Sequence, residues 1–270
     1  MAAKTPLAIR IAMSLQRGWV RPLLFLCLVI TLWDVSIRLF NVPSYQIPTP
    51  TAVLFALYTD AGPLLTQAIP TTIAAVGGFV LSAVFGILAA VLIAGSRRIE
   101  SYVYPLLVFS QSIPKVAIAP LFVVWFGFGI LPKILSAFLI GFFPVVVSAV
   151  QGFKSVEPEM LDLARAMEAN KLQIFRMVRF PHAMPAIFAG LKVSVTLAVV
   201  GAVVGEFVGS NNGIGFLLQR SIGNFELPTM FAALVVLSLI GVALFWILDV
   251  LERMTIPWHA SQRHQLIIPA

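Results

Sequence analysis

The chain has 270 residues, of which 18 are basic, 11 are acidic and 60% are hydrophobic. Charged residues make up 11% of it, against roughly a quarter in ordinary soluble domains. Residues 61–96, 134–153 and 227–248 contain no charged side chain. Because about 20 apolar residues in a helix cross the hydrocarbon core of a bilayer, this pattern predicts an all-α polytopic membrane protein. It excludes a soluble enzyme and a nucleic-acid-binding domain.

Six membrane spans are expected from the apolar runs. Lys4 and three arginines precede the first run, but no small-residue cleavage site follows it, so a retained helix is expected rather than a signal peptide. The predicted spans cover residues 22–40, 64–94, 102–126, 130–150, 186–208 and 228–251.

The positions of the basic residues predict the orientation of these spans. If the N-terminus is inside, 13 of the 18 basic residues fall in inner segments. Only Arg38, Lys133 and Arg220 fall in outer segments, and Lys115 and Lys192 lie within or beside spans. Because Lys and Arg concentrate in cytoplasmic loops, both termini are expected in the cytoplasm. The net charge of +7 is therefore an orientation signal and does not indicate nucleic-acid binding.

Three connecting segments stand out by length or composition. An outer loop over residues 41–63 contains Pro and Gly, and a short surface helix is expected at 52–58. The longest inner segment is 152–185, and a second outer loop, 209–227, is rich in Gly and Asn. We expect a first part at 1–63 (N-terminal cytoplasmic segment, first span and outer loop), a core at 64–258 and a cytoplasmic tail at 259–270.

The sequence contains no motif for catalysis or for ATP binding. It has no P-loop, HExxH, GxSxG or CxxC pattern. The lone Cys27 permits neither an intrachain disulfide nor a cysteine metal cluster, and the three histidines lack metal-ligand spacing. No catalytic residue and no metal site is expected, so the chain is not expected to be an enzyme.

The inner segment 157–185 has the pattern of two short amphipathic helices joined by a turn. Glu157 and Pro158 are typical of a helix start, and apolar residues then recur at spacings of three in two sets. Asn170 lies between the sets and tolerates the left-handed conformation of a tight turn, and Pro181 is expected to end the second helix. One interpretation is a connector lying on the membrane surface. The other is a helix–turn–helix segment presented to a cytosolic partner.

Two stretches resemble the permease subunits of ABC importers. Residues 162–181 match the spacing of the EAA loop, with Asp162, Leu163 and Ala164 on EAA, Glu168 on the glycine and Pro181 on the final proline. Residues 113–129, IPKVAIAPLFVVWFGFG, resemble the nitrate, sulfonate and taurine branch of that family.

This resemblance implies the type I importer permease fold in a bacterial cytoplasmic (inner) membrane. It implies a permease homodimer surrounded by membrane lipid, docked to a dimer of cytosolic ABC ATPases and supplied by an extracytoplasmic solute-binding protein. ATP and Mg would be bound by the ATPase, and this chain would bind no cofactor. The residues expected to couple to the ATPase are Asp162, Ala164, Arg165, Met167, Glu168, Asn170, Leu172, Phe175, Arg176 and Pro181.

Glu168 departs from the EAA pattern, because glycine at its position would permit a positive φ. We expect the first short helix to run slightly longer and Asn170 to make the turn. Alternatively, the Glu168 carboxylate contacts Arg165 or a basic residue of the ATPase.

Charged residues inside spans are costly and are therefore functional candidates. Lys115 follows Pro114, which is expected to break the third span and free carbonyls near Phe109–Ser112. Lys115 either attracts an anion in the transport path or has a structural role, pairing with Glu206 or capping the broken helix. Glu206 is either a gate or pairing residue or simply interfacial. The candidate pathway or gate residues are Ser110, Gln111, Ser112, Lys115 and Glu206.

Three further expectations concern helix contacts. Gly201, Gly205 and Gly209 form a small-residue ridge suited to close helix approach, within the subunit or in a dimer. Asp34 and Arg38 are expected to pair on one helix face. The tryptophans expected to anchor the chain at the membrane interface are Trp125, Trp246 and Trp258.

The resemblance favours a small anion such as nitrate, a sulfonate or taurine as the solute. The alternative within the same class is a pyrimidine or another vitamin precursor. A rival from another class is a membrane enzyme or assembly factor, but such an enzyme requires clustered His, Asp or Glu at the bilayer edge, and the sequence offers none.

Overall fold

The computed structural model describes residues 20–257, and this part of the chain is helical without strands. The predicted helices are present, including a surface helix capped by Thr49, but the fifth span begins well before residue 186, and the predicted outer loop 209–227 contains a helix that was not predicted. The helices are α2 (Val20–Leu39), α3 (Pro50–Thr59), α4 (Ala61–Gly95), α5 (Arg97–Gln111), α6 (Ala119–Phe126), α7 (Ile130–Lys154), α8 (Pro158–Ala166), α9 (Lys171–Ile174), α10 (Phe180–Gly209), α11 (Ile214–Gly223) and α12 (Leu227–Thr255). Trp258 and the predicted tail at 259–270 lie outside the described residues.

Within the described residues, five helices are long and apolar enough to cross a membrane, and a bent pair brings the number to as many as six. The bent pair is α5 with α6, at the position of the predicted third span. This confirms an all-helical membrane fold. The inside–outside orientation and the domain boundaries stay predictions.

The third span breaks at the predicted proline. The axis turns by 86° between α5 and the stretch that ends with α6. Pro114 has no N–H to continue the helix, and a 3₁₀ turn at Lys115–Ile118 leads into α6. Gly127, with φ of 74°, ends α6, so this short helix has a defined stop.

The chain divides into two compact units. Among the described residues, one unit contains 20–61 together with 221–232, and the other contains 62–220 and 233–257. In the first unit the Trp33 and Phe231 rings lie 5.8 Å apart, and Thr229 donates a hydrogen bond to Asp60. The residues discussed below as candidate sites belong to the second unit.

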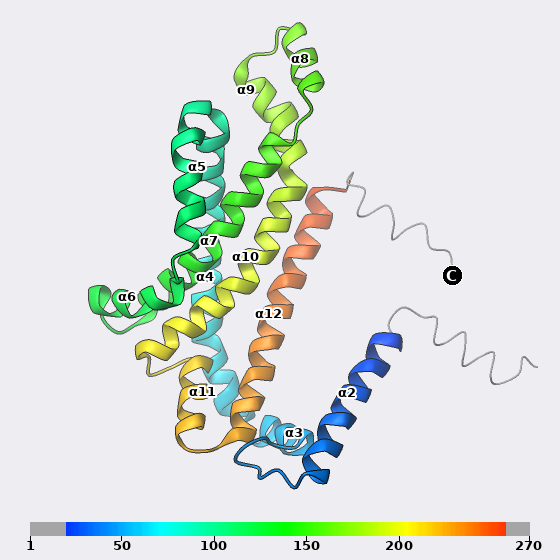
Figure 1. Cartoon of the computed structure of the whole chain (residues 1–270), viewed down its shortest axis with the longest axis vertical. Helices are drawn as coiled ribbons and strands as arrows, with labels where there is room; N and C mark the ends of the chain where they lie inside the picture. Colours follow the sequence, from blue (N-terminus) through cyan, green and yellow to red (C-terminus); the bar gives the residue numbers. More distant parts are fainter. Residues whose placement is uncertain (1–19, 258–270) are drawn as a thin grey trace, which may run out of the picture. The chain divides into compact units, whose positions relative to one another are not determined.

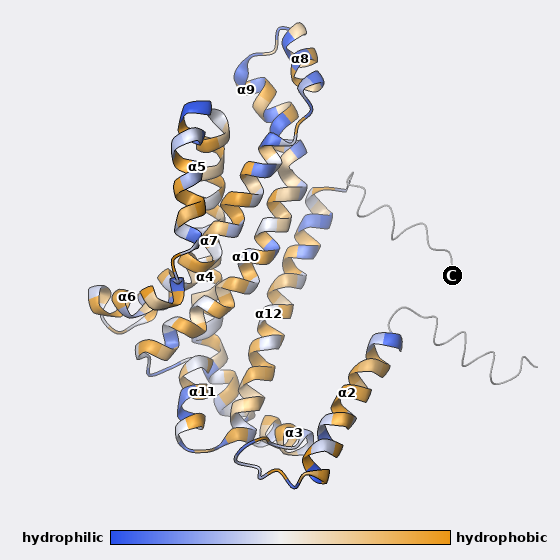
Figure 2. Ribbon diagram, in the orientation of Figure 1, coloured by the Kyte–Doolittle hydropathy of each residue, from blue (hydrophilic) through white to orange (hydrophobic). Residues whose placement is uncertain are grey.

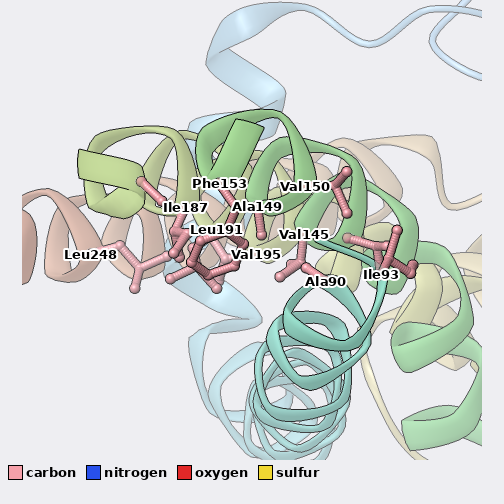
Figure 3. Close-up of a cluster of buried hydrophobic side chains, with 12 residues drawn as sticks. Ala90, Ile93, Val145, Ala149, Val150, Phe153, Ile187, Leu191, Val195 and Leu248 are labelled. Atoms are coloured by element: carbon pink, nitrogen blue, oxygen red, sulfur yellow. The ribbon is translucent and has the colours of Figure 1, made fainter. Parts of the chain in front are cut away.

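The buried core of the second unit is built around α7 and α10. Figure 3 shows side chains from α4, α7, α10 and α12 meeting there, among them Ala90, Val145, Val195 and Leu248. A methyl group at Gly201 of α10 would lie 2.6 Å from Cα of Ala137 on α7, so the two backbones are in close contact. The predicted glycine ridge therefore serves an intrasubunit contact at this position.

Much of the helix surface is apolar (Figure 2). Exposed side chains include Phe85 of α4, Leu239 of α12, and Trp125 and Trp246. Apolar exposure over long helices is expected of a surface that faces lipid or a partner subunit. The proposed anchoring role of the two tryptophans stays a prediction.

Candidate functional site

The predicted helix–turn–helix segment is present as α8, α9 and the turn between them (residues 157–179). Glu157 precedes α8, Pro158 occupies its first turn and Glu159 adds a carboxylate there, as expected at a helix N-terminus. In Figure 1 this segment lies at the end of α7 and α10 opposite to the loop that joins α10 to α11. It is therefore presented at one end of the helical core.

The turn is made by Glu168, which has φ of +58°. The N–H of Glu168 bonds to the carbonyl of Arg165 at 2.9 Å, and the N–H of Ala169 bonds to the carbonyl of Ala164 at 3.1 Å. These two bonds form a Schellman motif, in which glycine is the usual residue at the left-handed position. The prediction of a longer first helix with the turn at Asn170 is therefore wrong, because Glu168 takes the conformation of the motif glycine.

Asn170 is extended because it has a different task. Its side chain accepts a hydrogen bond from the N–H of Gln173, and the Gln173 side chain accepts one from the N–H of Asn170. This reciprocal capping box satisfies two N–H groups at the start of α9. Because Asn170 is extended in this capping box, the left-handed residue of the turn lies before it, at Glu168. Arg165 does not reach Glu168 and pairs instead with Asp162 at 2.7 Å.

The second short helix continues into the membrane-spanning helix without a break. Lys171–Gly209 is one helix of 39 residues, long and apolar enough to cross a membrane, so the prediction that Pro181 ends the second helix is wrong. A π-helical turn at Phe175–Arg179 precedes the proline, and the N–H of Phe180 bonds to the carbonyl of Phe175. Pro181 lies in the first turn of the α-helical stretch that follows, where the N–H it lacks is not needed.

An aromatic cluster fixes this junction to α7. The ring of Phe153 lies 5.6 Å from that of Phe175 and 6.5 Å from that of Phe180. Phe153 is buried in the core cluster. The base of the helix–turn–helix segment is thus anchored, while its tip is exposed.

The tip of the segment exposes apolar side chains beside charged ones. Leu163, Met167, Leu172 and Met177 are each more than 60% exposed. Among the predicted coupling residues, Ala164, Phe175 and Pro181 are half-buried. The exposed ones are Asp162, Arg165, Met167, Glu168, Asn170, Leu172 and Arg176. Such a mixed surface at the end of a rigid helix is suited to a protein partner.

The predicted pathway residues Gln111 and Lys115 line a groove of about 410 Å³. The Lys115 ammonium lies 4.6 Å from the centre of the Phe143 ring and donates to the Gln111 carbonyl at 3.4 Å. Ser148 of α7 adds a hydroxyl to the lining. This contact fits the alternative in which Lys115 caps the broken helix, whereas the alternative in which it pairs with Glu206 is wrong, because Glu206 faces Lys133. A role of Lys115 in the transport path stays a prediction. We call this region the Lys115 groove.

Ser110 and Ser112 do not line the Lys115 groove. Ser110 donates its hydroxyl to the carbonyl of Leu107, one turn earlier in the same helix. Ser112 lies at the end of α5, and its N–H bonds to the carbonyl of Phe109. The structure therefore brings two of the five predicted pathway residues together.

Glu206 is fully buried at the centre of a polar network. Its carboxylate accepts hydrogen bonds from the Thr71 hydroxyl at 2.8 Å and the Gly215 N–H at 2.7 Å. Thr71 in turn accepts from the N–H of Ile214 at 2.8 Å. Simple interfacial exposure of Glu206 is excluded, and its carboxylate pairs with groups from several elements. A gating role stays a prediction.

The cation of this network is Lys133, which sequence reasoning placed in an outer loop. Lys133 lies inside the first turn of α7 with 2% exposure, and its Nζ is 3.8 Å from the Glu206 carboxylate. It also donates to the Asn212 carbonyl at 2.8 Å. Gln67 of α4 accepts from the N–H of Gly213 at 2.6 Å. We call these groups, with Thr71, the Glu206 network.

The Glu206 network ties the 210–215 loop to α4, α7 and α10. Gly213 has φ of +108°, and a Cβ at this position would collide with the Glu206 carboxylate. Lys133 and Glu206 are isolated charges that each lie within three residues of a long apolar run, and this was the signal that could have suggested an ion pair. Because 73 residues separate them in the sequence, nothing indicated that they would meet.

Sequence reasoning also missed an ionic cluster between α10 and α12. Lys192 lies 2.6 Å from Asp249 and 2.5 Å from Glu252. Arg253 pairs with Asp249 at 2.8 Å. Asp34 and Arg38 of α2 pair at 2.7 Å as predicted. These charges are matched within the chain.

The chemistry available in this structure is conformational. Among residues 20–257, no group of three or more His, Cys, Asp or Glu side chains could hold a metal ion. The buried carboxylate of Glu206 is engaged in hydrogen bonds with the Thr71 hydroxyl and the Gly215 N–H. The features that stand out are a groove with a cation, an internally matched network and the exposed tip of the helix–turn–helix segment.

Comparisons with known proteins agree with this picture. The chain is 37% identical over 242 residues to the formylaminopyrimidine transport permease of Halalkalibacterium halodurans, covering 89% of this chain and 96% of that one. It is 36% identical to the riboflavin transport system permease of Chloroflexus aurantiacus, over 87% of this chain and 89% of the relative. It is 30% identical to a putative aliphatic sulfonates transport permease of Bacillus subtilis, over 90% and 89%.

A solved structure shows the same fold. An inward-facing form of the MetNI methionine ABC transporter aligns with a TM-score of 0.60 at 22% identity, over 71% of this chain and 95% of that chain. The family model of binding-protein-dependent transport system inner membrane components matches residues 82–256. The chain is therefore a member of that family, a transport permease of the ABC importer class with the type I fold and not an enzyme.

Proposed function

We propose that this chain forms the membrane path of an importer, in which a cytosolic ATPase drives the helix–turn–helix segment. The observation that carries the proposal is the continuity of that segment with α10. The 39-residue helix Lys171–Gly209 is about 58 Å long at 1.5 Å per residue, longer than the bilayer core. It joins the exposed tip directly to Glu206, so a displacement of the tip is transmitted to the far end of the helix.

In the proposed cycle, two copies of the chain bind two ATPase subunits. ATP binding closes the ATPases, α8 and α9 follow, and the helices tilt as rigid bodies to expose the path on alternate sides. An extracytoplasmic binding protein delivers the solute. A second copy facing the Lys115 groove would enclose it between subunits.

A point variant tests ATPase docking more cleanly than deletion of the segment. Met167 and Met254 are each 74% exposed, but Met254 lies in the last turn of α12, away from the helix–turn–helix segment. Met167→Asp should abolish copurification of the ATPase while leaving membrane insertion intact, and Met254→Asp should retain it. A double variant that carries both Met167→Asp and Leu172→Asp and still binds the ATPase would falsify the docking proposal.

For the solute, we propose a small heteroaromatic vitamin precursor. The two relatives at 36–37% identity are named for a formylaminopyrimidine and for riboflavin, which supports this class. In the Lys115 groove an aromatic ring and amide and hydroxyl groups surround a cation, a lining that suits a polar heteroaromatic ring.

A sulfonate-type anion is the second candidate, favoured by Lys115 itself and by the 30% identical sulfonate relative. Uptake of labelled formylaminopyrimidine, riboflavin and taurine, in cells with and without the permease, separates the two classes. Lys115→Met should reduce uptake of an anion severely and of a neutral ring mildly. Full uptake by this variant would remove Lys115 from the path.

A further inference from the structure

A second cavity lies between the end of α4 and the helix–turn–helix segment. Its volume is about 530 Å³, and it shares no lining residue with the Lys115 groove. The lining comes from α4, α8, α9 and the π-helical turn, and includes Gly95, Leu161 and Phe175. Arg165, Leu172 and Phe175 of this lining are also predicted coupling residues, but ATPase docking at the exposed tip does not account for the space behind them.

The cavity concentrates positive charge. Arg165, Lys171 and Arg179 all line it, and no Asp or Glu is among its lining residues, all of which the structure describes. Arg165 has Asp162 as a partner, but that pair is solvent-exposed, with side-chain exposures of 63% and 70%. Lys171 makes no ion pair with any residue of the described range. The site therefore favours an anion.

Arg179 holds a donor that the protein leaves unused. Its Nη1 donates to the carbonyl of Ala94 at 3.4 Å, at the end of α4. Its Nε is buried and has no hydrogen-bond partner. Buried N–H groups without partners are rare in folded proteins and indicate a missing ligand, ion or water. A guanidinium presents its donors in a planar fork that fits a phosphate.

The rest of the lining is apolar. Its apolar lining residues are Val91, Leu161, Leu172, Ile174 and Phe175. The cavity also lies at the edge of the membrane core, because the charge-free run of residues 61–96 ends there and Arg97 and Arg98 follow. A ligand with a phosphate and an apolar body fits a lining that holds both cations and apolar side chains.

We propose that this cavity binds the headgroup of an anionic phospholipid. The phosphate accepts from Arg179 Nε, Lys171 and Arg165, and the glycerol and acyl chains follow Val91 and Phe175 along α4. Basic pockets between helices at the cytoplasmic face are typical headgroup sites. The lipid would bridge α4 to the helix–turn–helix segment.

The test measures which lipid stays bound to the full chain. The permease is placed in nanodiscs containing equal phosphatidylglycerol and phosphatidylcholine, and retained lipid is identified by native mass spectrometry. Phosphatidylglycerol should be preferred, and each lost cation should lower the preference about fivefold, as about 1 kcal/mol per basic residue implies. The variants are Lys171→Gln and Arg179→Lys, the second keeping the charge while removing Nε. Arg98→Gln is the matched control, because Arg98 is exposed at the same end and does not line the cavity.

Three outcomes would overturn the proposal. The first is equal retention of the two lipids, or a loss of the phosphatidylglycerol preference that is as large in Arg98→Gln as in Lys171→Gln. The second is displacement of phosphatidylglycerol by millimolar inorganic phosphate, which would indicate a soluble anion. The third is loss of the preference when the ATPase is added, which would assign the cavity to an acidic group of that partner. ATPase copurification is scored separately, so failure here leaves the importer proposal standing.

Discussion

The Glu206 network and the helix–turn–helix segment treat charge in opposite ways. In the network, Glu206 and Lys133 are 0% and 2% exposed, and both are held by groups from other elements. In the segment, Asp162 and Arg165 form a pair three residues apart on one exposed helix. A charge inside the membrane must be matched by the chain itself, whereas a charge at the exposed tip remains available to another protein.

This difference separates two kinds of role. Removing one partner of a buried pair costs about 3–5 kcal/mol because the other charge is left without compensation. An exposed pair contributes about 0–1 kcal/mol. Substitutions in the network should therefore change the stability of the fold, and substitutions at the tip should change partner binding. The predictions below test this contrast, from the largest effect to the smallest.

The largest effect is expected from Glu206→Ala. Thr71, Lys133 and the Gly215 N–H all lose their acceptor, so unfolding free energy should fall by about 3–5 kcal/mol. Thermal unfolding of the detergent-solubilised protein measures this. Glu206→Gln with Lys133→Met should recover part of the loss, because no uncompensated charge remains. An unchanged melting temperature in Glu206→Ala would contradict the network.

A smaller loss is expected from Gly201→Ala. The added methyl group would lie 2.6 Å from Cα of Ala137 and would separate α7 from α10. Overpacking of this kind costs about 1–3 kcal/mol. Gly241→Ala is the matched control, since a Cβ at Gly241 meets no atom within 4 Å. If both variants unfold at the same temperature, the close contact between α7 and α10 is not what requires glycine at position 201.

A gain is expected from Glu168→Gly in the helix–turn–helix segment. The left-handed conformation is costly for Glu and free for Gly, but glycine loses more chain entropy on folding. The net gain should be at most about 1 kcal/mol, seen as slower hydrogen exchange at the amides of Glu168 and Ala169. Ala169→Gly, at a residue without positive φ, should speed exchange. Faster exchange in Glu168→Gly would show that the carboxylate itself stabilises the turn.

The smallest effect on stability is expected from Arg165→Gln. Its pair with Asp162 is exposed, so unfolding free energy should change by less than about 1 kcal/mol. ATPase binding, measured by copurification, should weaken by more than the stability change implies. A melting temperature that falls as far as in Glu206→Ala would end the contrast between the two regions.

The long helices and the break at Pro114 were predictable because both depend on local sequence. Charge-free runs predict α4, α7 and α12, and a proline lacks the N–H that a continuous helix needs. The Glu206–Lys133 pair was not predictable in the same way, since 73 residues separate its members and only tertiary packing brings them together. Lys133 also lies one residue after a proline, where a loop is a natural interpretation.

The turn of the helix–turn–helix segment was misassigned although its sequence held the answer. Asn170 followed three residues later by Gln173 is the signature of a capping box, which needs an extended residue at its start. Asn is also common in left-handed turns, and that pattern was given priority over the capping box. Once Asn170 is committed to the cap, Glu168 at the motif glycine is left to make the turn.

The π-helical turn at Phe175–Arg179 has a consequence for how this chain tolerates insertions and deletions. A π turn holds one more residue than an α turn, and each α-helical residue rotates the helix by about 100°. Deleting one residue there would convert the π turn into an α turn, which completes one full rotation with one residue fewer, so α9 and the membrane helix would keep nearly the same relative orientation. A deletion in the regular α-helical part, by contrast, would rotate α9 by about 100° relative to the membrane helix. The π turn is therefore the place in this helix where one residue can be lost while the tip still presents the same face.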